Sequence, residues 1–348
     1  MPKKKLLPKD FDELLAQGDL ATLQSVFATC DVDARGGPGK QTALAFDLCP
    51  DDLARWLVAN GADLAAADTW GNTVLHSRAD SRRSSIAVLL QLGADPRIRN
   101  DRAGTPLHAA ARSSNARNAE LLIAAGAEVD ALDADGLTPL ELAVRGASNA
   151  DLERVATFAD ALLSAGAVRT PRLTGFVEEI GKRFEFFRER FNPETVDAAS
   201  AALDRLYALF DARPVPRRAM HDGKSLIAVK PGAWQDQHRA LWDLLVPASG
   251  AAATMQGELI RLSGRIGHEL DGNGGVNWDA DFNRMVDAAL AILACGEPLA
   301  QSDLSEAAAF AAQVKRRPGE TSRLAQFAVA WVQRNPAPIA LPAPTYRR

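Results

Sequence analysis

A short phrase recurs three times in the first half of the chain at an almost constant interval. The phrases are "NTVLH" with Thr73, "GTPLH" with Thr105 and "LTPLE" with Thr138, which places the threonines 32 and then 33 residues apart. A fixed period of this length indicates a stack of equivalent units, because a unit this short cannot bury its apolar face alone. The first half is therefore predicted to be a repeat array.

A second series of phrases keeps the same interval. Gly61, Gly93, Gly126 and Gly166 each begin a Gly-Ala pair, and only the last interval is stretched, by seven residues. A threonine at a helix start accepts hydrogen bonds from free backbone amides, and a glycine allows the positive φ at which a helix ends. Pro106 and Pro139 stand in the first turn, where a helix tolerates proline. Each unit is therefore predicted to be a helix, a turn and a second helix.

The two series together resemble ankyrin repeats. The resemblance rests on the TPLH-like phrases and on apolar pairs such as Leu121-Leu122 before each Gly-Ala. It also rests on a polar residue five positions before each threonine, namely Asp68, Asn100 and Asp133. It implies an ankyrin-repeat solenoid of about five units over residues 8–170, including two degenerate units before the first phrase.

Three positions depart from the ankyrin pattern. Ala103 stands where the turn glycine normally lies, and Ala45 and Glu141 replace the usual histidine. We expect the corresponding turns to be weaker. Where the histidine is present, as His76 and His108, the resemblance implies a structural role in which the ring bonds backbone across units.

The composition favours helices and excludes several classes of protein. Alanine is abundant and only 6% of the residues are aromatic, which favours an all-α fold. The three cysteines, Cys30, Cys49 and Cys295, fit neither a disulfide framework nor a cysteine-based zinc site. Since no apolar run is long enough for a signal peptide or a membrane span, we expect a cytoplasmic protein that does not enter a membrane.

The charges are nearly balanced in both halves. Residues 1–171 carry 18 basic and 23 acidic side chains, and residues 172–348 carry 22 and 21. Neither half has the basic excess that is typical of a nucleic-acid-binding protein, so no direct binding of nucleic acid is expected.

The second half has helical periodicity without a repeat. We predict capping or connecting helices over residues 171–215, a helical C-terminal domain over residues 216–335 and a disordered, proline-rich tail over residues 336–348. The expected helices cover residues 172–192, 194–211, 234–245, 251–270, 279–295, 302–316 and 320–334. The segment "SLIAVKPG", residues 225–232, is too short for an assignment.

A polar cluster follows the expected 251–270 helix, in the segment "GHELDGNGGVNWDADF". One face of that helix carries a second candidate site, which consists of Glu258, Arg261, Arg265, His268 and Glu269. One interpretation is structural: one helix ends and another begins, with Asn277 or Asp279 as the N-cap. The charged residues Arg261, Arg265 and Glu269 then form a solvated or partner-facing strip. The other interpretation is an acid–base group of Glu258, His268 and Asp271.

The polar cluster does not fit a metal site. Counted from Asp271, the sixth residue is not glycine and the twelfth is Phe282, where a calcium loop needs a glutamate. For zinc, His268 has no second histidine in register. The surrounding segment, residues 241–282, is similar to a module of bacterial hypothetical proteins to which no chemistry is attached.

The sequence predicts a protein-binding module and not an enzyme. It contains no glycine-rich phosphate loop, no nucleophile motif and no metal-ligand spacing, so neither a cofactor nor a metal is expected. In ankyrin proteins the hairpin tips and the exposed starts of the inner helices bind the partner. By resemblance, the partner-binding residues here are Thr69, Trp70, Asn72, Asp80, Asp101, Arg102, Arg112, Asp135, Leu137 and Arg145.

The narrower functional prediction is a bacterial cytoplasmic immunity or regulatory protein that binds and neutralises a partner protein. A basic toxin would suit the mildly acidic first half, because complementary charge accelerates capture. Two alternatives remain: a helical enzyme domain that ankyrin repeats deliver to its target, and an ankyrin effector directed at host proteins.

Overall fold

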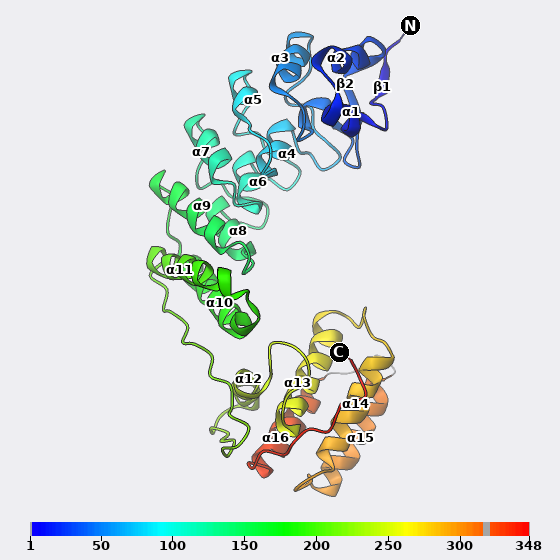
Figure 1. Cartoon of the computed structure of the whole chain (residues 1–348), viewed down its shortest axis with the longest axis vertical. Helices are drawn as coiled ribbons and strands as arrows, with labels where there is room; N and C mark the ends of the chain where they lie inside the picture. Colours follow the sequence, from blue (N-terminus) through cyan, green and yellow to red (C-terminus); the bar gives the residue numbers. More distant parts are fainter. Residues whose placement is uncertain (1, 316–320, 348) are drawn as a thin grey trace. The chain divides into compact units, whose positions relative to one another are not determined.

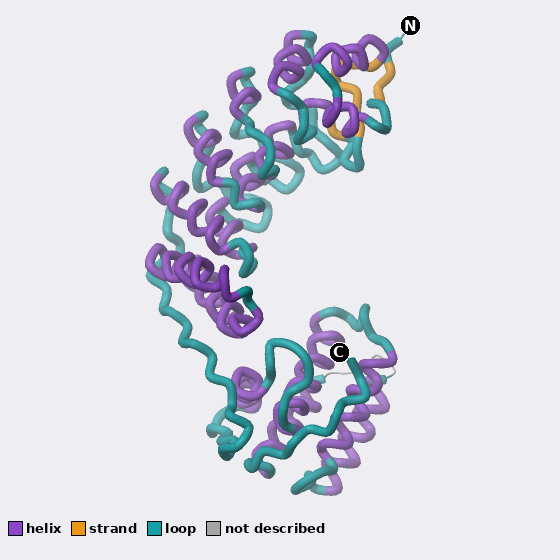
Figure 2. The backbone as a smooth tube through the Cα atoms, viewed as in Figure 1, coloured by secondary structure: helices purple, strands orange, loops and turns teal. Residues whose placement is uncertain are grey.

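The computed structural model describes residues 2–315 and 321–347. Contacts divide the chain into two units, the first comprising Met1–Phe184 and Phe191–Val215 and the second comprising Glu185–Arg190 and Pro216–Arg348. Both units are built from helices, so the all-α prediction is confirmed, although a few strands lie near the N-terminus (Figure 2). Among the described residues, no helix is both long enough and apolar enough to cross a membrane.

The N-terminal part of the first unit contains a small sheet that the sequence does not predict. Strands β1 (Lys4–Leu6), β2 (Cys30–Gly36) and β3 (Gln41–Thr42) lie in that order, with β1 parallel to β2 and β2 antiparallel to β3. Helices α1 (Phe11–Gln17) and α2 (Leu20–Thr29) connect β1 to β2, and the 3-10 helix η1 (Ala43–Ala45) and helix α3 (Asp51–Ala59) follow β3. Because β1 is exposed along its whole length, no alternating apolar pattern marks it.

Three helix pairs carry the repeated phrases, and they stack in chain order (Figure 1). The pairs are α4 (Val74–Asp80) with α5 (Ala87–Gln91), α6 (Pro106–Arg112) with α7 (Ala116–Ala124), and α8 (Pro139–Gly146) with α9 (Leu152–Ser164). The first helices pack on one another, α4 on α6 and α6 on α8, and α7 packs on α9. Helices α10 (Pro171–Phe187) and α11 (Pro193–Leu209) follow, and α11 packs on α9.

The repeated histidines link each helix start to the next unit. The backbone N–H of Thr73 donates to Nδ1 of His76 at 3.2 Å, so Nε2 carries the proton and donates to the Gly104 carbonyl at 3.0 Å. Thr105, His108 and the Leu137 carbonyl repeat this arrangement one unit later. Both rings are buried, and the structure therefore gives these histidines the structural role that the resemblance implies.

Glu141 takes the place of the histidine in the third unit without losing its contacts. Its carboxylate accepts the Thr138 backbone N–H at 3.1 Å, while its own N–H donates to the Thr138 hydroxyl at 3.2 Å. The Thr170 hydroxyl donates to the other carboxylate oxygen at 2.6 Å. The expectation of a weaker turn here is therefore wrong, because glutamate completes the same capping box. At Ala103 the backbone does adopt a positive φ of 55°, which is costly for a residue with a Cβ.

The second unit is a bundle of helices α12 (Trp234–Leu245), α13 (Met255–Gly267), α14 (Ala280–Leu293), α15 (Gln301–Val314) and α16 (Ser322–Arg334). A single π-helical turn, His268–Gly272, continues α13. The expected helices lie within a few residues of these bounds, except that residues 316 and 320 lie outside the described part of the chain. Helix α13 begins at Met255 and not at residue 251, because Thr254 is its N-cap.

The C-terminal tail, predicted to be disordered over residues 336–348, packs against α13 as far as it is described. The Met255 N–H donates to the Ile339 carbonyl at 2.8 Å, and the Ile339 N–H donates to the Gln256 side chain at 3.0 Å. Tyr346 is buried, and its hydroxyl donates to Glu258 at 2.5 Å. Proline has no backbone N–H to donate, so the proline-rich composition suggested a disordered tail. The apolar residues between the prolines nevertheless join the core of the second unit.

Candidate protein-binding surface

The hairpin tips between helix pairs are held by one repeated side-chain contact. Asp68 Oδ1 accepts the backbone N–H groups of Trp70 and Asn72, both at 2.8 Å. Asn100 makes the same two contacts in the next tip and Asp133 makes them in the third, at 2.9 to 3.0 Å. The polar residue that stands five positions before each threonine therefore closes the tip, which positions the tip side chains before any partner arrives.

Backbone and side-chain bonds also join neighbouring tips to one another. The Thr69 N–H donates to the Gly39 carbonyl at 3.0 Å, and the Ala134 N–H donates to the Arg102 carbonyl at 2.9 Å. The Asn100 amide donates to the Asn72 amide oxygen at 2.7 Å. Asn72 is half-buried in this ladder, so its role is to connect tips and its side chain offers little to a partner.

Trp70 is the largest apolar side chain exposed on the tips. It is 58% exposed, and the rest of its indole lies against Gly39 of the preceding tip. An aromatic side chain of this kind is a typical anchor in a protein interface.

Charged residues form weak pairs on the tips and at the C-terminal ends of α4 and α6. Arg102 lies 3.5 Å from Asp135, and Arg112 lies 3.4 Å from Asp80. All four side chains are substantially exposed, and such pairs add little stability, so a partner can exchange them at low cost. Thr69, Asp101 and Arg145 are also exposed.

The structure corrects one predicted contact residue. Leu137 is only 3% exposed, and its carbonyl receives the bond from His108. The residue directly precedes the helix-capping Thr138, where its side chain turns inward. It therefore does not belong to a surface that a partner could touch.

The second candidate site is divided between buried and exposed side chains. Arg261 donates to both carboxylate oxygens of Glu258, at 2.9 and 2.6 Å, and both residues are buried. Burial raises the pKa of Glu258, but the bonds from Arg261 and Tyr346 outweigh it and leave that pKa below its usual value. Tyr346 covers the pair of Glu258 and Arg261. This pair therefore has the features of a structural ion pair within the fold.

Glu269 is buried as well, and it holds the loop that follows α13. Its carboxylate accepts the Asn277 N–H at 2.6 Å and the Asn273 amide at 3.1 Å. The expected solvated strip of Arg261, Arg265 and Glu269 is therefore wrong for Arg261 and Glu269, while Arg265 is exposed.

The structure also does not bring the three residues of the acid–base interpretation into contact. Asp271 accepts a bond from Thr321, Glu258 is enclosed and His268 is exposed, and no hydrogen bond or ion pair among the described residues joins the three. Asp279 caps α14, as one of the two expected N-caps. Within the residues that the structure describes, no group of three or more His, Cys, Asp or Glu side chains is arranged to hold a metal ion.

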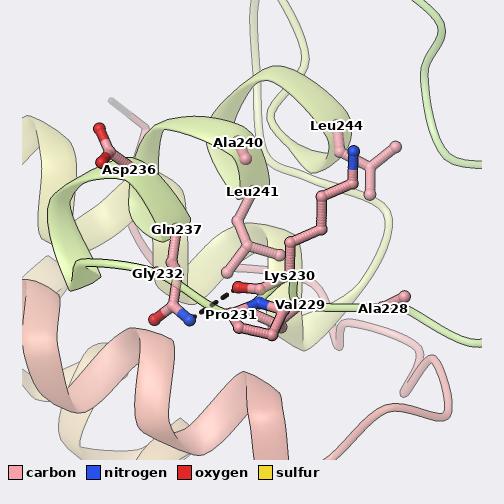
Figure 3. Close-up of a pocket in the computed structure, with 10 residues that line it drawn as sticks. All are labelled: Ala228, Val229, Lys230, Pro231, Gly232, Asp236, Gln237, Ala240, Leu241 and Leu244. Carbon is pink, nitrogen blue, oxygen red and sulfur yellow. Dashed lines mark hydrogen bonds between the residues drawn. The ribbon is translucent and has the colours of Figure 1, made fainter.

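A pocket that no sequence motif marks lies beside α12. Its volume is about 480 Å³, and it is lined by Ala228, Val229, Lys230, Pro231, Gly232, Asp236, Gln237, Ala240, Leu241 and Leu244 (Figure 3). Half of this lining comes from the segment that is too short for an assignment. The only local indication is that α12 carries the apolar residues Ala240, Leu241 and Leu244 on one side.

Comparison with known proteins places the repeats in a family. A family model for ankyrin repeats, comprising three copies, matches residues 79–156. The chain is similar to the ARF GTPase-activating protein Git of Drosophila melanogaster, at 43% identity over 79 residues, which are 22% of this chain and 11% of that protein. It is also similar to the glycerophosphocholine phosphodiesterase gde1 of Schizosaccharomyces pombe, at 32% identity over 112 residues (31% and 10%). A third relative is the intracellular phospholipase A2 of Caenorhabditis elegans, at 35% identity over 109 residues (28% and 10%).

The chain spans about a tenth of the length of each of these relatives. Their names describe three different activities, whereas the family model covers helices α5 to α8 with the end of α4 and the start of α9. Residues 79–156 are ankyrin repeats, and ankyrin repeats are protein-binding modules.

Proposed function

We propose that the first unit binds another protein through its hairpin tips, with Trp70 as the central anchor. The observation that carries this proposal is the 58% exposure of Trp70 on a tip that Asp68 holds in place. Arg102, Asp101 and Asp135 on the following tips supply polar contacts around the indole. An exposed aromatic anchor with a polar rim is the usual composition of a protein interface.

The finer proposal is that the chain is a bacterial cytoplasmic immunity or regulatory protein that neutralises a basic toxin. Its support is the excess of acidic over basic side chains in residues 1–171, 23 against 18, which would accelerate the capture of a basic partner. In this proposal the ankyrin tips cover the surface with which the toxin acts.

Affinity capture followed by calorimetry tests the binding proposal. The full chain is used to capture its partner from cells of the source organism, and the identified partner is then produced separately. We expect Trp70→Ala and Arg102→Ala to weaken its binding, and Arg117→Ala, which alters an exposed residue of helix α7, to leave it unchanged. Equal affinity for all three variants would contradict the assignment of the tips.

Co-expression tests the neutralisation proposal separately. The partner alone should arrest growth, the full chain should restore it, and the double variant Trp70→Ala, Arg102→Ala should restore it poorly. A partner that binds but is harmless would contradict the toxin proposal and leave the binding proposal intact. If the chain captures a protein from host cells and none from the source organism, the alternative of a host-directed effector is favoured.

A further inference from the structure

The pocket beside α12 is a groove with two different walls. One wall is a run of five consecutive residues, Ala228 to Gly232, and the other is one side of α12, with Ala240, Leu241 and Leu244 (Figure 3). Most of the groove surface is apolar, and Ala240 and Ala228 are exposed. The volume of about 480 Å³ exceeds what a single side chain fills.

The backbone of the first wall has free hydrogen-bonding groups. Ile227 donates to the Pro336 carbonyl at 2.8 Å, and the Lys230 carbonyl accepts from the Gln237 side chain at 2.8 Å. Between these anchors, the peptide groups of Ala228 and Val229 form no hydrogen bond with any described residue. Leu226, just before them, is 70% exposed. A non-helical segment with free N–H and C=O groups beside an apolar floor can pair with an extended peptide.

The charges at the groove favour an acidic occupant. Asp236 already has a cation close by, since Arg239 lies 3.9 Å from it on the same helix. Lys230 has no ion pair with any described residue, and its side chain extends towards Leu244 (Figure 3). Lys230 is therefore the charged residue of the lining with which an acidic group of a partner can pair.

We propose that this groove binds an extended segment of another protein that carries apolar side chains and an acidic residue. The segment pairs with the backbone at Ala228 and Val229, inserts an apolar side chain over Leu241 and Leu244, and places its carboxylate at Lys230. This site lies in the second unit and does not depend on the function of the ankyrin repeats.

Selection from a random peptide library, with the full chain as bait, tests the proposal. We expect the recovered peptides to combine apolar residues with Asp or Glu. Ala240→Arg, which fills the groove from an exposed position, should weaken their binding roughly tenfold or more, and Lys230→Glu should weaken the acidic peptides selectively. The matched control is Gln235→Arg, an exposed position of the same helix outside the groove, which should bind as the parent chain does.

Hydrogen exchange on the peptide complex gives an independent measurement. The bound peptide should protect the amides of Ala228 and Val229, because pairing with its backbone occupies them. The proposal would be overturned if the selected peptides bound Ala240→Arg with the same affinity as the parent chain. It would also be overturned if the library yielded no binding peptide. Protection that depends on protein concentration without peptide would assign the groove to a second copy of this chain, and would also overturn it.

Discussion

The indole of Trp70 covers Gly39 so closely that a Cβ atom at Gly39 would lie 2.6 Å from Cζ3 of Trp70. Only a residue without a side chain fits beneath the ring, so the glycine of one tip sets the position of the tryptophan on the next. The exposed 58% of the indole is thereby held at the surface in a defined orientation.

We expect Gly39→Ala to displace Trp70 and to weaken partner binding with little effect on folding. Trp70→Ala should cost about 2 kcal/mol of binding free energy, as truncation of an interface aromatic usually does. Gly39→Ala should lose part of that amount, and the double variant should lose no more than Trp70→Ala alone. Calorimetry with the captured partner measures the three values. Additive losses would show that Gly39 acts independently of the tryptophan.

The stability of the first unit should fall in mild acid. Burial lowers the pKa of His76 and His108 below the usual 6.5, and Nδ1 of each ring accepts a backbone N–H. The unfolded chain therefore binds protons more readily than the folded one. The stability that the two neutral histidines contribute is complete above about pH 6.5. It is lost as the pH falls towards their lower pKa in the folded state.

Hydrogen exchange within residues 73–144 measures this loss between about pH 7.5 and pH 5. The measurement must be local, because burial also lowers the pKa of His238 in the second unit, to about 4, with the same sign. A variant with His76→Gln and His108→Gln should be less stable at neutral pH but should lose the pH dependence. If the stability of this double variant still fell between these pH values, the loss could not be assigned to His76 and His108.

Arg78 is expected to destabilise the repeat that contains it. It is 3% exposed, and its Nε and Nη1 atoms have no hydrogen-bond partner among the described residues. The equivalent positions of the next two repeats hold Ala110 and Ala143. Arg78→Met keeps an apolar stem and removes the buried charge, which should stabilise the chain by about 1 to 4 kcal/mol in urea unfolding.

The control for this prediction is Arg82→Met at an exposed position, with a change within about 0.5 kcal/mol. A loss of stability in Arg78→Met would indicate that the guanidinium is satisfied by water or an anion.

Tyr346→Phe should destabilise the second unit. The substitution removes the hydroxyl that donates to Glu258 at 2.5 Å and leaves a buried carboxylate with one bond fewer, at a cost of about 1 to 3 kcal/mol. Thr345→Val, at an exposed neighbouring position, is the matched control. His268→Ala should change stability by less than about 0.5 kcal/mol, because the ring is exposed. Thermal unfolding of the three variants checks these values. If Tyr346→Phe were as stable as the parent chain, the tail would not stabilise the Glu258–Arg261 ion pair.

The ankyrin repeats were predictable because their information is local and repeated. A threonine caps its own helix, Asp68 bonds amides two and four residues away, and the turn glycines take φ values of 91° to 95° where helices end. Each contact lies within a few residues, so the same letters reappear at every period. Even Glu141, which departs from the family's pattern, preserves the capping chemistry within three residues.

The polar cluster of the second unit could not be predicted in this way. Glu258 and Arg261 stand three residues apart on a helix, and their spacing is equally suitable for a solvated strip and for a buried pair. The residue that buries them, Tyr346, lies 88 positions from Glu258 in a segment whose composition suggested disorder. The groove at Ala228 and Val229 likewise depends on the side of α12 along which residues 228–232 run before that helix begins, and no local pattern marks that side. Burial is a property of what folds over a side chain, and in this unit the covering segments come from distant parts of the chain that no local pattern connects.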